Sequence, residues 1–259
     1  MFKNIILSRE LIVQLFKRDF FAAYKKSFLG IFWIFIAPLI GILSWVFMNA
    51  AGVLNPGDVG IPYPAYVLLG SSIWGLFMGF YKAAAATLDV GSAFILQVKY
   101  PHEALLVKQV AQQLANFLIS FVMTLIVLIA FGIVPSWKML FFPFLIAPLF
   151  FLGSAIGLVI SVANVISNEF QKCMDVLLGF CLYLTPVIYS SNIKSPFFQT
   201  ILQWNPLTYL IGVPRDIIIY GRIEHADRFI LAALFSFVLF LFSWRFFYIA
   251  EDRIIEKIL

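Results

Sequence analysis

The stretch Tyr24–Leu39, which reads YKKSFLGIFWIFIAPL, decides the fold. Its basic part ends at Lys26, and no charged residue follows between Ser27 and Gly57. Because a helix needs about 20 consecutive apolar residues to cross a bilayer, this run is long enough to be a transmembrane helix. The lysines in front of it mark the side of the membrane on which the chain begins.

The composition of the whole chain is that of a multi-pass membrane protein. Of its 259 residues, 63% are hydrophobic and only 12% are charged, whereas a soluble domain is about 45–50% apolar and about 25% charged. The net charge of +5 does not indicate a nucleic-acid partner, because the basic residues stand beside apolar runs, where cytoplasmic loops collect Lys and Arg. We therefore expect one all-α integral membrane domain.

Residues 1–27 are expected to form a cytoplasmic amphipathic helix at the membrane surface. On a helical wheel the apolar side chains share one face, which only Asp19 interrupts, and the polar side chains lie opposite. A basic polar face suits anionic headgroups. A cleaved secretory signal is disfavoured, because the apolar run that follows is too long for one. The apolar face consists of Ile5, Leu11, Ile12, Leu15 and Phe16.

Five further apolar runs complete a set of about six expected transmembrane helices. A polar interval at 87–103, broken by Pro101, separates the second run from the third. With the N-terminus inside, most Lys and Arg residues fall on inner segments, whereas the two short outer loops carry only Lys138. This asymmetry predicts that both termini are cytoplasmic. The expected spans cover about residues 28–54, 64–86, 107–133, 139–165, 174–191 and 229–250.

Residues 195–222, before the last span, form a different kind of segment. Its first part, Ser195–Pro214, is uncharged but contains several prolines and amides. Such a mixture cannot be a regular lipid-facing helix, because every backbone polar group at membrane depth needs a partner. We predict two short re-entrant helices here, with an ordinary soluble loop as the alternative, followed by a charge pair between Arg215 and Asp216.

The motifs of a self-powered pump or an enzyme are missing from the sequence. There is no Walker A pattern and no metal-binding motif. Cys173 and Cys181, roughly 12 Å apart if they share a helix, are too far apart for a disulfide. No expected span carries an unpaired acid near its middle, where ion-coupled transporters place ionisable groups. Energy for uphill transport must therefore come from another chain.

Aromatic residues make up 18% of the chain, and most are expected to face lipid or neighbouring helices. Tyr and Trp near span ends act by default as interfacial anchors. The alternative is that some face a lumen, where a ring can stack on the C–H face of a sugar while its polar atom stays wet. The candidates for this channel role are Trp33, Trp74, Tyr183 and Tyr189.

Four segments, in the same order, resemble the ABC-2 type permeases that export bacterial polysaccharides, including O-antigen, capsule and wall teichoic acid exporters. The first resembles the opening of the family's first span, the second its loop after the second span, and the others its fifth span and the stretch that follows. The matching residues are Tyr24–Trp33 with Pro38-Leu39, Lys99–Glu103 (KYPHE), Thr185–Tyr189 (TPVIY), and Asn205-Pro206-Leu207 with Arg215-Asp216.

The resemblance implies a homodimer in the bacterial cytoplasmic (inner) membrane, working with two copies of a separate cytoplasmic ATPase. That partner would bind Mg-ATP, so this chain would need no cofactor. The substrate would be a lipid-linked glycan, usually on undecaprenyl diphosphate, and periplasmic or outer-membrane export proteins are further candidate partners. The resemblance assigns ATPase coupling to Lys99, Tyr100, Pro101, His102 and Glu103, and an outer gate to Asn205, Pro206, Arg215 and Asp216.

The headgroup cluster, defined as Arg18, Tyr24, Lys25 and Lys26, is the candidate site for the lipid diphosphate. Its cations would make charge-assisted contacts to phosphate, and anchoring to ordinary anionic lipid is the alternative. The sequence departs from the family at Ala23, where Arg is common, and at residues 168–172 (NEFQK), where O-antigen members often have an aromatic-Arg-Asp. These departures leave the O-antigen, capsule and teichoic acid branches open.

Three rival functions also remain open. An ABC-2 exporter of a drug or small lipid would share the fold and differ in cargo. A membrane-embedded glycosyl-carrier enzyme would need clustered carboxylates at one interface, whereas Asp58, Asp89 and Asp216 are scattered along the chain. A structural scaffold would have little use for a polar re-entrant segment.

Overall fold

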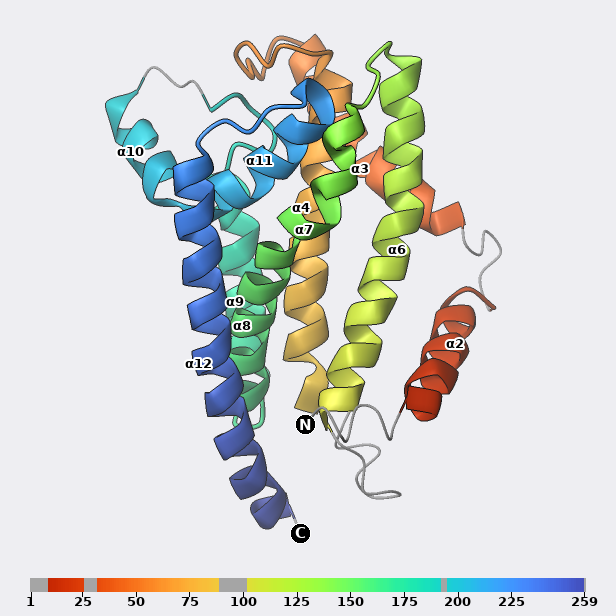
Figure 1. Cartoon of the computed structure of the whole chain (residues 1–259), viewed down its shortest axis with the longest axis vertical. Helices are drawn as coiled ribbons and strands as arrows, with labels where there is room; N and C mark the ends of the chain where they lie inside the picture. Colours follow the sequence, from red (N-terminus) through yellow and green to blue (C-terminus); the bar gives the residue numbers. More distant parts are fainter. Residues whose placement is uncertain (1–8, 26–31, 89–101, 192–194, 259) are drawn as a thin grey trace.

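The computed structural model describes residues 9–25, 32–88, 102–191 and 195–258, and in this part of the chain it is helical and has no strand (Figure 1). This agrees with the all-α prediction. The helices are α2 (Arg9–Lys25), α3 (Trp33–Ala50), α4 (Tyr63–Ala85), α6 (His102–Ala130), the 3-10 helix η2 (Trp137–Phe141), α7 (Phe142–Leu145), α8 (Ala147–Asn164), α9 (Glu169–Cys181), α10 (Pro196–Trp204), α11 (Pro206–Tyr220) and α12 (Ala226–Ile258).

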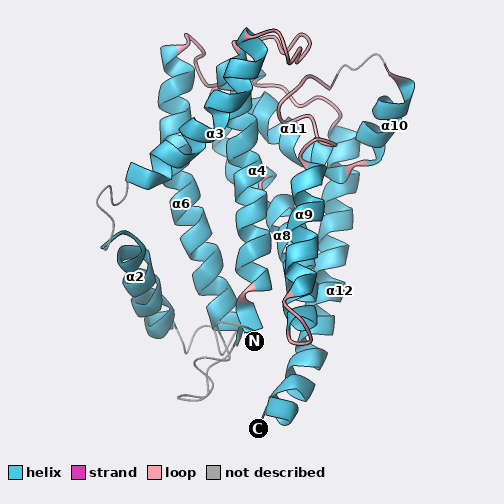
Figure 2. Ribbon diagram, turned by 180° about the vertical axis from the view of Figure 1, so that it is seen from behind, coloured by secondary structure: helices cyan, strands magenta, loops and turns pink. Residues whose placement is uncertain are grey.

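Four segments of the described chain are long and apolar enough to cross a membrane. They are Tyr63–Ala85, Leu106–Ala130, Trp137–Asn164 and Ala226–Ala250, and Leu39–Ala50 in α3 is a shorter apolar helix. Figure 2 shows the long helices α4, α6, α8 and α12 running side by side. The helices α10 and α11 lie at the end of this bundle opposite to the start of α6 and the end of α12.

Helix α4 is the centre of the bundle. It packs against α8 and α6 most extensively and also against α3 and α11, while α8 packs against α12 on its other side. The largest side chains that are fully buried, Tyr81, Phe77 and Phe80, all belong to α4. A helix that is apolar nearly all round is expected to be surrounded by other elements, which is what the position of α4 shows.

Two glycines of α8 set the close approach of α8 to α4. A Cβ atom added at Gly153 would lie 2.9 Å from the carbonyl oxygen of Phe77. One added at Gly157 would overlap the carbonyl oxygen of Tyr81 and the Cβ of Ala84. Small residues spaced four apart allow two helix backbones to meet in this way.

The structure corrects the predicted helix at 174–191. Helix α9 begins earlier, at Glu169, and ends at Cys181, and turns and bends follow over residues 182–190. Pro186 lacks the N–H that a continuing helix would need, and Thr185 Oγ1 donates to the carbonyl oxygen of Cys181 at 2.8 Å. The polar residues at 169–172, expected in a loop, form the first turn of α9 instead. Both cysteines lie on this helix and are unpaired.

The segment before α12 is a helical pair, as predicted. Helices α10 and α11 meet at Asn205, the N-cap residue of α11. The Asn205 side-chain oxygen accepts a hydrogen bond from the backbone N–H of Leu207 at 3.0 Å, and Pro206 supplies the first helical residue, where its missing N–H is tolerated.

Candidate functional site

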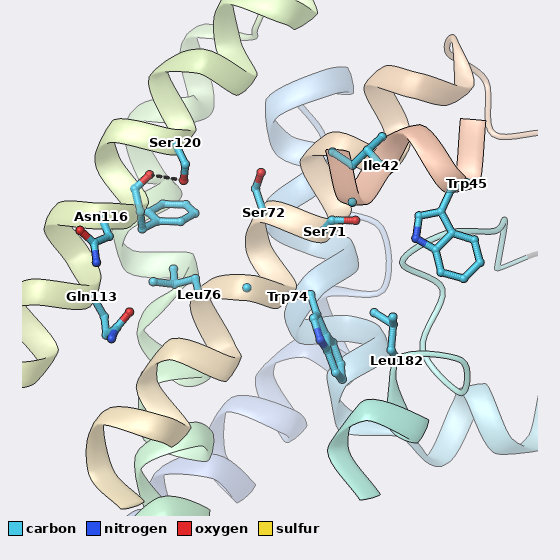
Figure 3. Close-up of a pocket in the computed structure, with 13 residues that line it drawn as sticks. Ile42, Trp45, Ser71, Ser72, Trp74, Leu76, Gln113, Asn116, Ser120 and Leu182 are labelled. Carbon is cyan, nitrogen blue, oxygen red and sulfur yellow. Dashed lines mark hydrogen bonds between the residues drawn. The ribbon is translucent and has the colours of Figure 1, made fainter. Parts of the chain in front are cut away.

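A cavity of about 420 Å³ lies between α3, α4 and α6, beside the residue that follows α9. Figure 3 shows the amides of Gln113 and Asn116 on the α6 side of this cavity and the indoles of Trp45 and Trp74 on the other. The cavity is lined by Gly41, Ile42, Trp45, Ser71, Ser72, Trp74, Gly75, Leu76, Gln113, Asn116, Phe117, Ser120 and Leu182. We call it the indole–amide cavity.

Two of the serine hydroxyl groups that line the indole–amide cavity are held by their own helices. Ser72 Oγ donates to the carbonyl oxygen of Leu68 at 2.8 Å and lies 3.0 Å from Thr124 Oγ1 on α6. Ser120 Oγ donates to the carbonyl oxygen of Phe117 at 3.0 Å. Because these donors are satisfied within the protein, their oxygens can line an otherwise apolar bundle without the cost of an unpaired polar group.

This lining is chemically suited to a hydroxylated ligand. An indole presents a flat apolar face together with an N–H donor, and an amide offers both a donor and an acceptor. Binding sites typically combine a mostly apolar wall with a few placed polar groups. The indole–amide cavity can therefore accept a sugar ring through stacking and hydrogen bonds.

The predicted channel aromatics separate into two groups. Trp74 lines the indole–amide cavity, and Tyr183 lies beside it, with its ring centroid 6.0 Å from that of Trp45 in an edge-on contact. Trp33 is 47% exposed near the start of α3, and Tyr189 donates from Oη to the carbonyl oxygen of Tyr183 at 2.8 Å. Neither Trp33 nor Tyr189 lines the cavity.

Sequence reasoning missed Trp45, which is the second indole of the cavity. The signal in the sequence is the spacing, because Trp45 follows Gly41 by four residues, which places both on one helix face. The structure adds what the sequence could not show: a Cβ added at Gly41 would meet nothing within 4 Å, so this face of α3 is open at the cavity.

A buried polar cluster holds together the end of the bundle at which α11 lies, and we call it the outer cluster after the predicted outer gate whose residues it contains. Arg215 of α11 donates from Nη1 to Tyr66 Oη at 2.6 Å and to the carbonyl oxygen of Pro186 at 2.8 Å. Its Nε donates to Asp216 Oδ1 at 3.2 Å, which confirms the predicted charge pair. Tyr66 of α4 in turn donates to the carbonyl oxygen of Tyr189 at 2.9 Å. The Arg215 guanidinium thus joins α11, α4 and the segment that follows α9.

Asn205 extends this outer cluster. Its Nδ2 donates to the carbonyl oxygen of Leu184 and to Thr185 Oγ1, both at 2.9 Å. The residues predicted for an outer gate, Asn205, Pro206, Arg215 and Asp216, therefore converge on the non-helical segment after α9. Burial raises the pKa of the Asp216 carboxyl above its ordinary value, although the neighbouring Arg215 opposes the shift. The gating role itself stays a prediction.

The family model described as "ABC-2 type transporter" matches residues 10–219, which is most of the chain. The chain belongs to the ABC-2 type transporter family. The matched range contains the indole–amide cavity and the residues of the outer cluster, and it confirms the family membership predicted from the sequence.

Curated relatives of this ABC-2 chain align along most of its length. The O-antigen export system permease protein RfbA of Myxococcus xanthus is 26% identical over 234 residues, which cover 89% of this chain and 88% of the relative. A protein of the same name from Klebsiella pneumoniae is 22% identical over 222 residues, or 83% of both chains. The polysialic acid transport protein KpsM of Escherichia coli is 20% identical over 243 residues, or 88% of both.

Two predicted sites of this ABC-2 chain lie largely outside the described residues. In the headgroup cluster, Arg18 is a described side chain and is paired with Asp19 at 2.8 Å. The backbone of Tyr24 and Lys25 ends α2, and Lys26 lies outside the described residues. Of the coupling residues, Lys99, Tyr100 and Pro101 lie outside them, and the backbone of His102 and Glu103 begins α6. Both assignments stay predictions.

The structure places one acid, Asp175, at the centre of α9, a helix that is not among the four spanning segments. The fifth predicted span was placed from residue 174, which put Asp175 at its edge. Because α9 begins earlier than the predicted span, Asp175 lies at the centre of the observed helix instead of at the edge of the predicted one. Its carboxyl interacts with Tyr81 of α4, although Asp175 Oδ1 and Tyr81 Oη, both buried, form no hydrogen bond of ordinary length among the described residues.

Proposed function

We propose that this chain is the transmembrane subunit of an ATP-driven exporter that moves a lipid-linked polysaccharide across the bacterial cytoplasmic membrane. The observation that carries the proposal is the indole–amide cavity, where two indoles and two amides line a space between apolar helices. The names of the curated relatives, which refer to O-antigen export and polysialic acid transport, support the same cargo class.

The proposed assembly is a homodimer with two copies of a cytoplasmic ATPase. The sequence contains no Walker A pattern, so nucleotide binding and hydrolysis are assigned to the ATPase. Its motion would reach this chain through residues 87–103 and move the helices as rigid bodies. The glycan would pass along aromatic and polar walls, held by several weak contacts that let it slide.

The nearest rival, an ABC-2 exporter of a drug or small lipid, is less well supported by the cavity. An apolar cargo gains nothing from amide groups, and burying Gln113 against it would leave the amide short of partners. A polymer with many hydroxyl groups would offer the Gln113 amide a succession of hydrogen-bond partners as it moves. The polar side of the cavity therefore favours a glycan.

The proposal is tested by complementing a strain that lacks this gene. We expect the deletion to abolish surface polysaccharide and to leave lipid-linked glycan inside the cell, and the wild-type gene to restore export. Trp45→Leu and Gln113→Leu should each lower export by about tenfold, because each removes a contact worth roughly 1–2 kcal/mol. The matched control is Trp137→Leu, since Trp137 is largely exposed in η2 and does not line the cavity.

Two results would contradict the proposal. Surface polysaccharide that persists in the deletion strain would exclude this chain as its exporter. Normal export by both cavity variants, at wild-type amounts of membrane protein, would remove the cavity from the transport path. Increased drug sensitivity without a change in surface glycan would favour the rival cargo.

A further inference from the structure

Helix α2 packs chiefly against α6. Ile12 and Leu15 of its apolar face are buried. Asp19, which interrupts that face in the sequence, points toward α6, where its Oδ2 atom lies 2.7 Å from Lys108 Nζ. The acid that looked misplaced on the helical wheel is therefore the charged contact between these two helices.

The two partners of Asp19 differ sharply in burial. The Lys108 side chain is only 7% exposed, whereas that of Arg18, which also pairs with Asp19, is 57% exposed. Exposed ion pairs contribute little, but removing one partner of a buried pair leaves an uncompensated charge. Among the described residues, Asp19 is the acid that lies within ion-pair distance of Lys108. Removing the Asp19 carboxylate while α2 stays packed on α6 would thus leave a buried ammonium group without its partner.

The Asp19–Lys108 pair lies close in the sequence to two predicted functional segments, the coupling segment and the headgroup cluster. Lys108 lies six residues after His102, which is both the first residue of α6 and one of the predicted coupling residues. Asp19 lies beside Arg18 and less than two turns before Tyr24 on α2. A rigid helix and one buried ion pair therefore connect the coupling side of the chain with the headgroup cluster.

We propose that the Asp19–Lys108 pair makes α2 follow α6, so that motion of α6 repositions the headgroup cluster. Both are positioning residues that act through the headgroup cluster. The inference rests on the proposed function, because it concerns delivery of a lipid-linked cargo. Beyond the proposed function, the inference states that motion of α6 moves the interface helix α2, which therefore does not rest passively on the membrane surface.

The test uses the complete complex with its ATPase in proteoliposomes that contain labelled lipid-linked glycan. Asp19→Asn and Lys108→Met should each reduce transport by about tenfold, in the range typical of a coupling between sites, while ATP hydrolysis stays near the wild-type rate. The exchanged pair, Asp19→Lys with Lys108→Asp, should recover most of the transport. Glu10→Gln, which neutralises an exposed acid on the same helix, is the matched control and should transport normally.

A second readout is independent of cargo. A spin label at Val13, an exposed position on α2, should become more mobile in Asp19→Asn and return to its wild-type mobility in the exchanged pair. Single variants that transport normally, that lose ATP hydrolysis together with transport, or that the exchange does not rescue would each overturn the proposal. If the wild-type complex moves no glycan, the proposed function fails first, whereas the label mobility still reports whether the pair holds α2.

Discussion

Two tyrosines of α4 show how strongly the surroundings decide what a side chain contributes. Tyr66 Oη accepts a hydrogen bond from Arg215 and donates to the carbonyl oxygen of Tyr189, and the Arg215 guanidinium lies 4.3 Å from the centroid of its ring. Tyr81 Oη is buried and forms no hydrogen bond of ordinary length among the described residues, and it interacts with the Asp175 carboxyl of α9. The first hydroxyl organises the outer cluster, whereas the second interacts with a single carboxyl group.

Replacing each tyrosine by phenylalanine should therefore have different effects. Tyr66→Phe leaves the buried Arg215 short of an acceptor, so we expect a loss of about 1–3 kcal/mol in unfolding free energy. Tyr81→Phe removes a hydroxyl that interacts with the Asp175 carboxyl without a hydrogen bond of ordinary length, so we expect a smaller loss, below about 1 kcal/mol. Thermal unfolding of both purified variants in the same detergent measures the difference. Equal destabilisation by the two substitutions would contradict this account of the outer cluster.

The residues of the outer cluster were only partly predictable. Asn205, Arg215 and Asp216 stood out in the sequence because they were polar in an apolar setting. Tyr66 did not, since its partners lie more than a hundred residues away along the chain. The same reason explains why Trp45 was missed, because the cavity it lines exists only once α3, α4 and α6 have packed.

At the scale of helices, the crossing of α4 and α8 depends on the absence of a side chain at Gly157. A Cβ there would overlap backbone and Cβ atoms of α4, which cannot move aside as the end of a flexible side chain would. We expect Gly157→Ala to cost about 1–3 kcal/mol of stability through overpacking. Gly179→Ala is the control, since a Cβ at Gly179 meets nothing within 4 Å. A stable Gly157→Ala variant would mean that the two helices do not touch at this point.

The attachment of α2 to α6 should depend on pH. Burial acts to raise the pKa of Asp19, but hydrogen bonds from Arg18 and Lys108 outweigh it and hold the pKa below the ordinary value of 3.8. Because the folded pKa is lowered, the contribution of the pair is complete above about pH 5 and is lost as the pH falls through the lowered pKa, below 3.8. A spin label at Val13 should stay immobile from pH 7 to about pH 5 and become mobile only in stronger acid.

Two outcomes of that titration are informative. In Asp19→Asn the label should be mobile throughout, without the acid transition. A transition of the same size in Asp19→Asn would show that another group controls the contact.

The elements themselves were largely readable from hydropathy and turn residues. The apolar runs predicted at 64–86 and 107–133 correspond closely to α4 and α6, and proline and asparagine marked the helical pair α10 and α11. The end of α9 was misplaced, because the length expected of a spanning helix outweighed the local signal of Thr185-Pro186. The Thr185-Pro186 pair was the better guide to the end of α9, because a threonine can hydrogen-bond back to the helix and a proline cannot continue it.

At the scale of the whole molecule, the fold places predicted inner and outer parts at opposite ends. The loop around Asp58 and the pair α10–α11 lie at one end, and the turn between α8 and α9 lies at the other (Figure 1). The predicted topology has both termini in the cytoplasm, so a cysteine at Asp58 should react only with reagent added outside, and one at Lys172 only with reagent that enters the cell. The native Cys173 and Cys181 must first be replaced. Labelling of both sites from the same side would contradict the topology.

The central claim is that this chain supplies a path for a glycan but takes its energy from a partner. The most direct measurement reconstitutes the purified chain in proteoliposomes, with and without the ATPase, and follows a labelled lipid-linked polysaccharide. We predict ATP-dependent movement of the glycan only when both proteins are present, and no ATP hydrolysis by this chain alone. Hydrolysis by the chain alone, or no glycan movement with both proteins and ATP present, would contradict the claim.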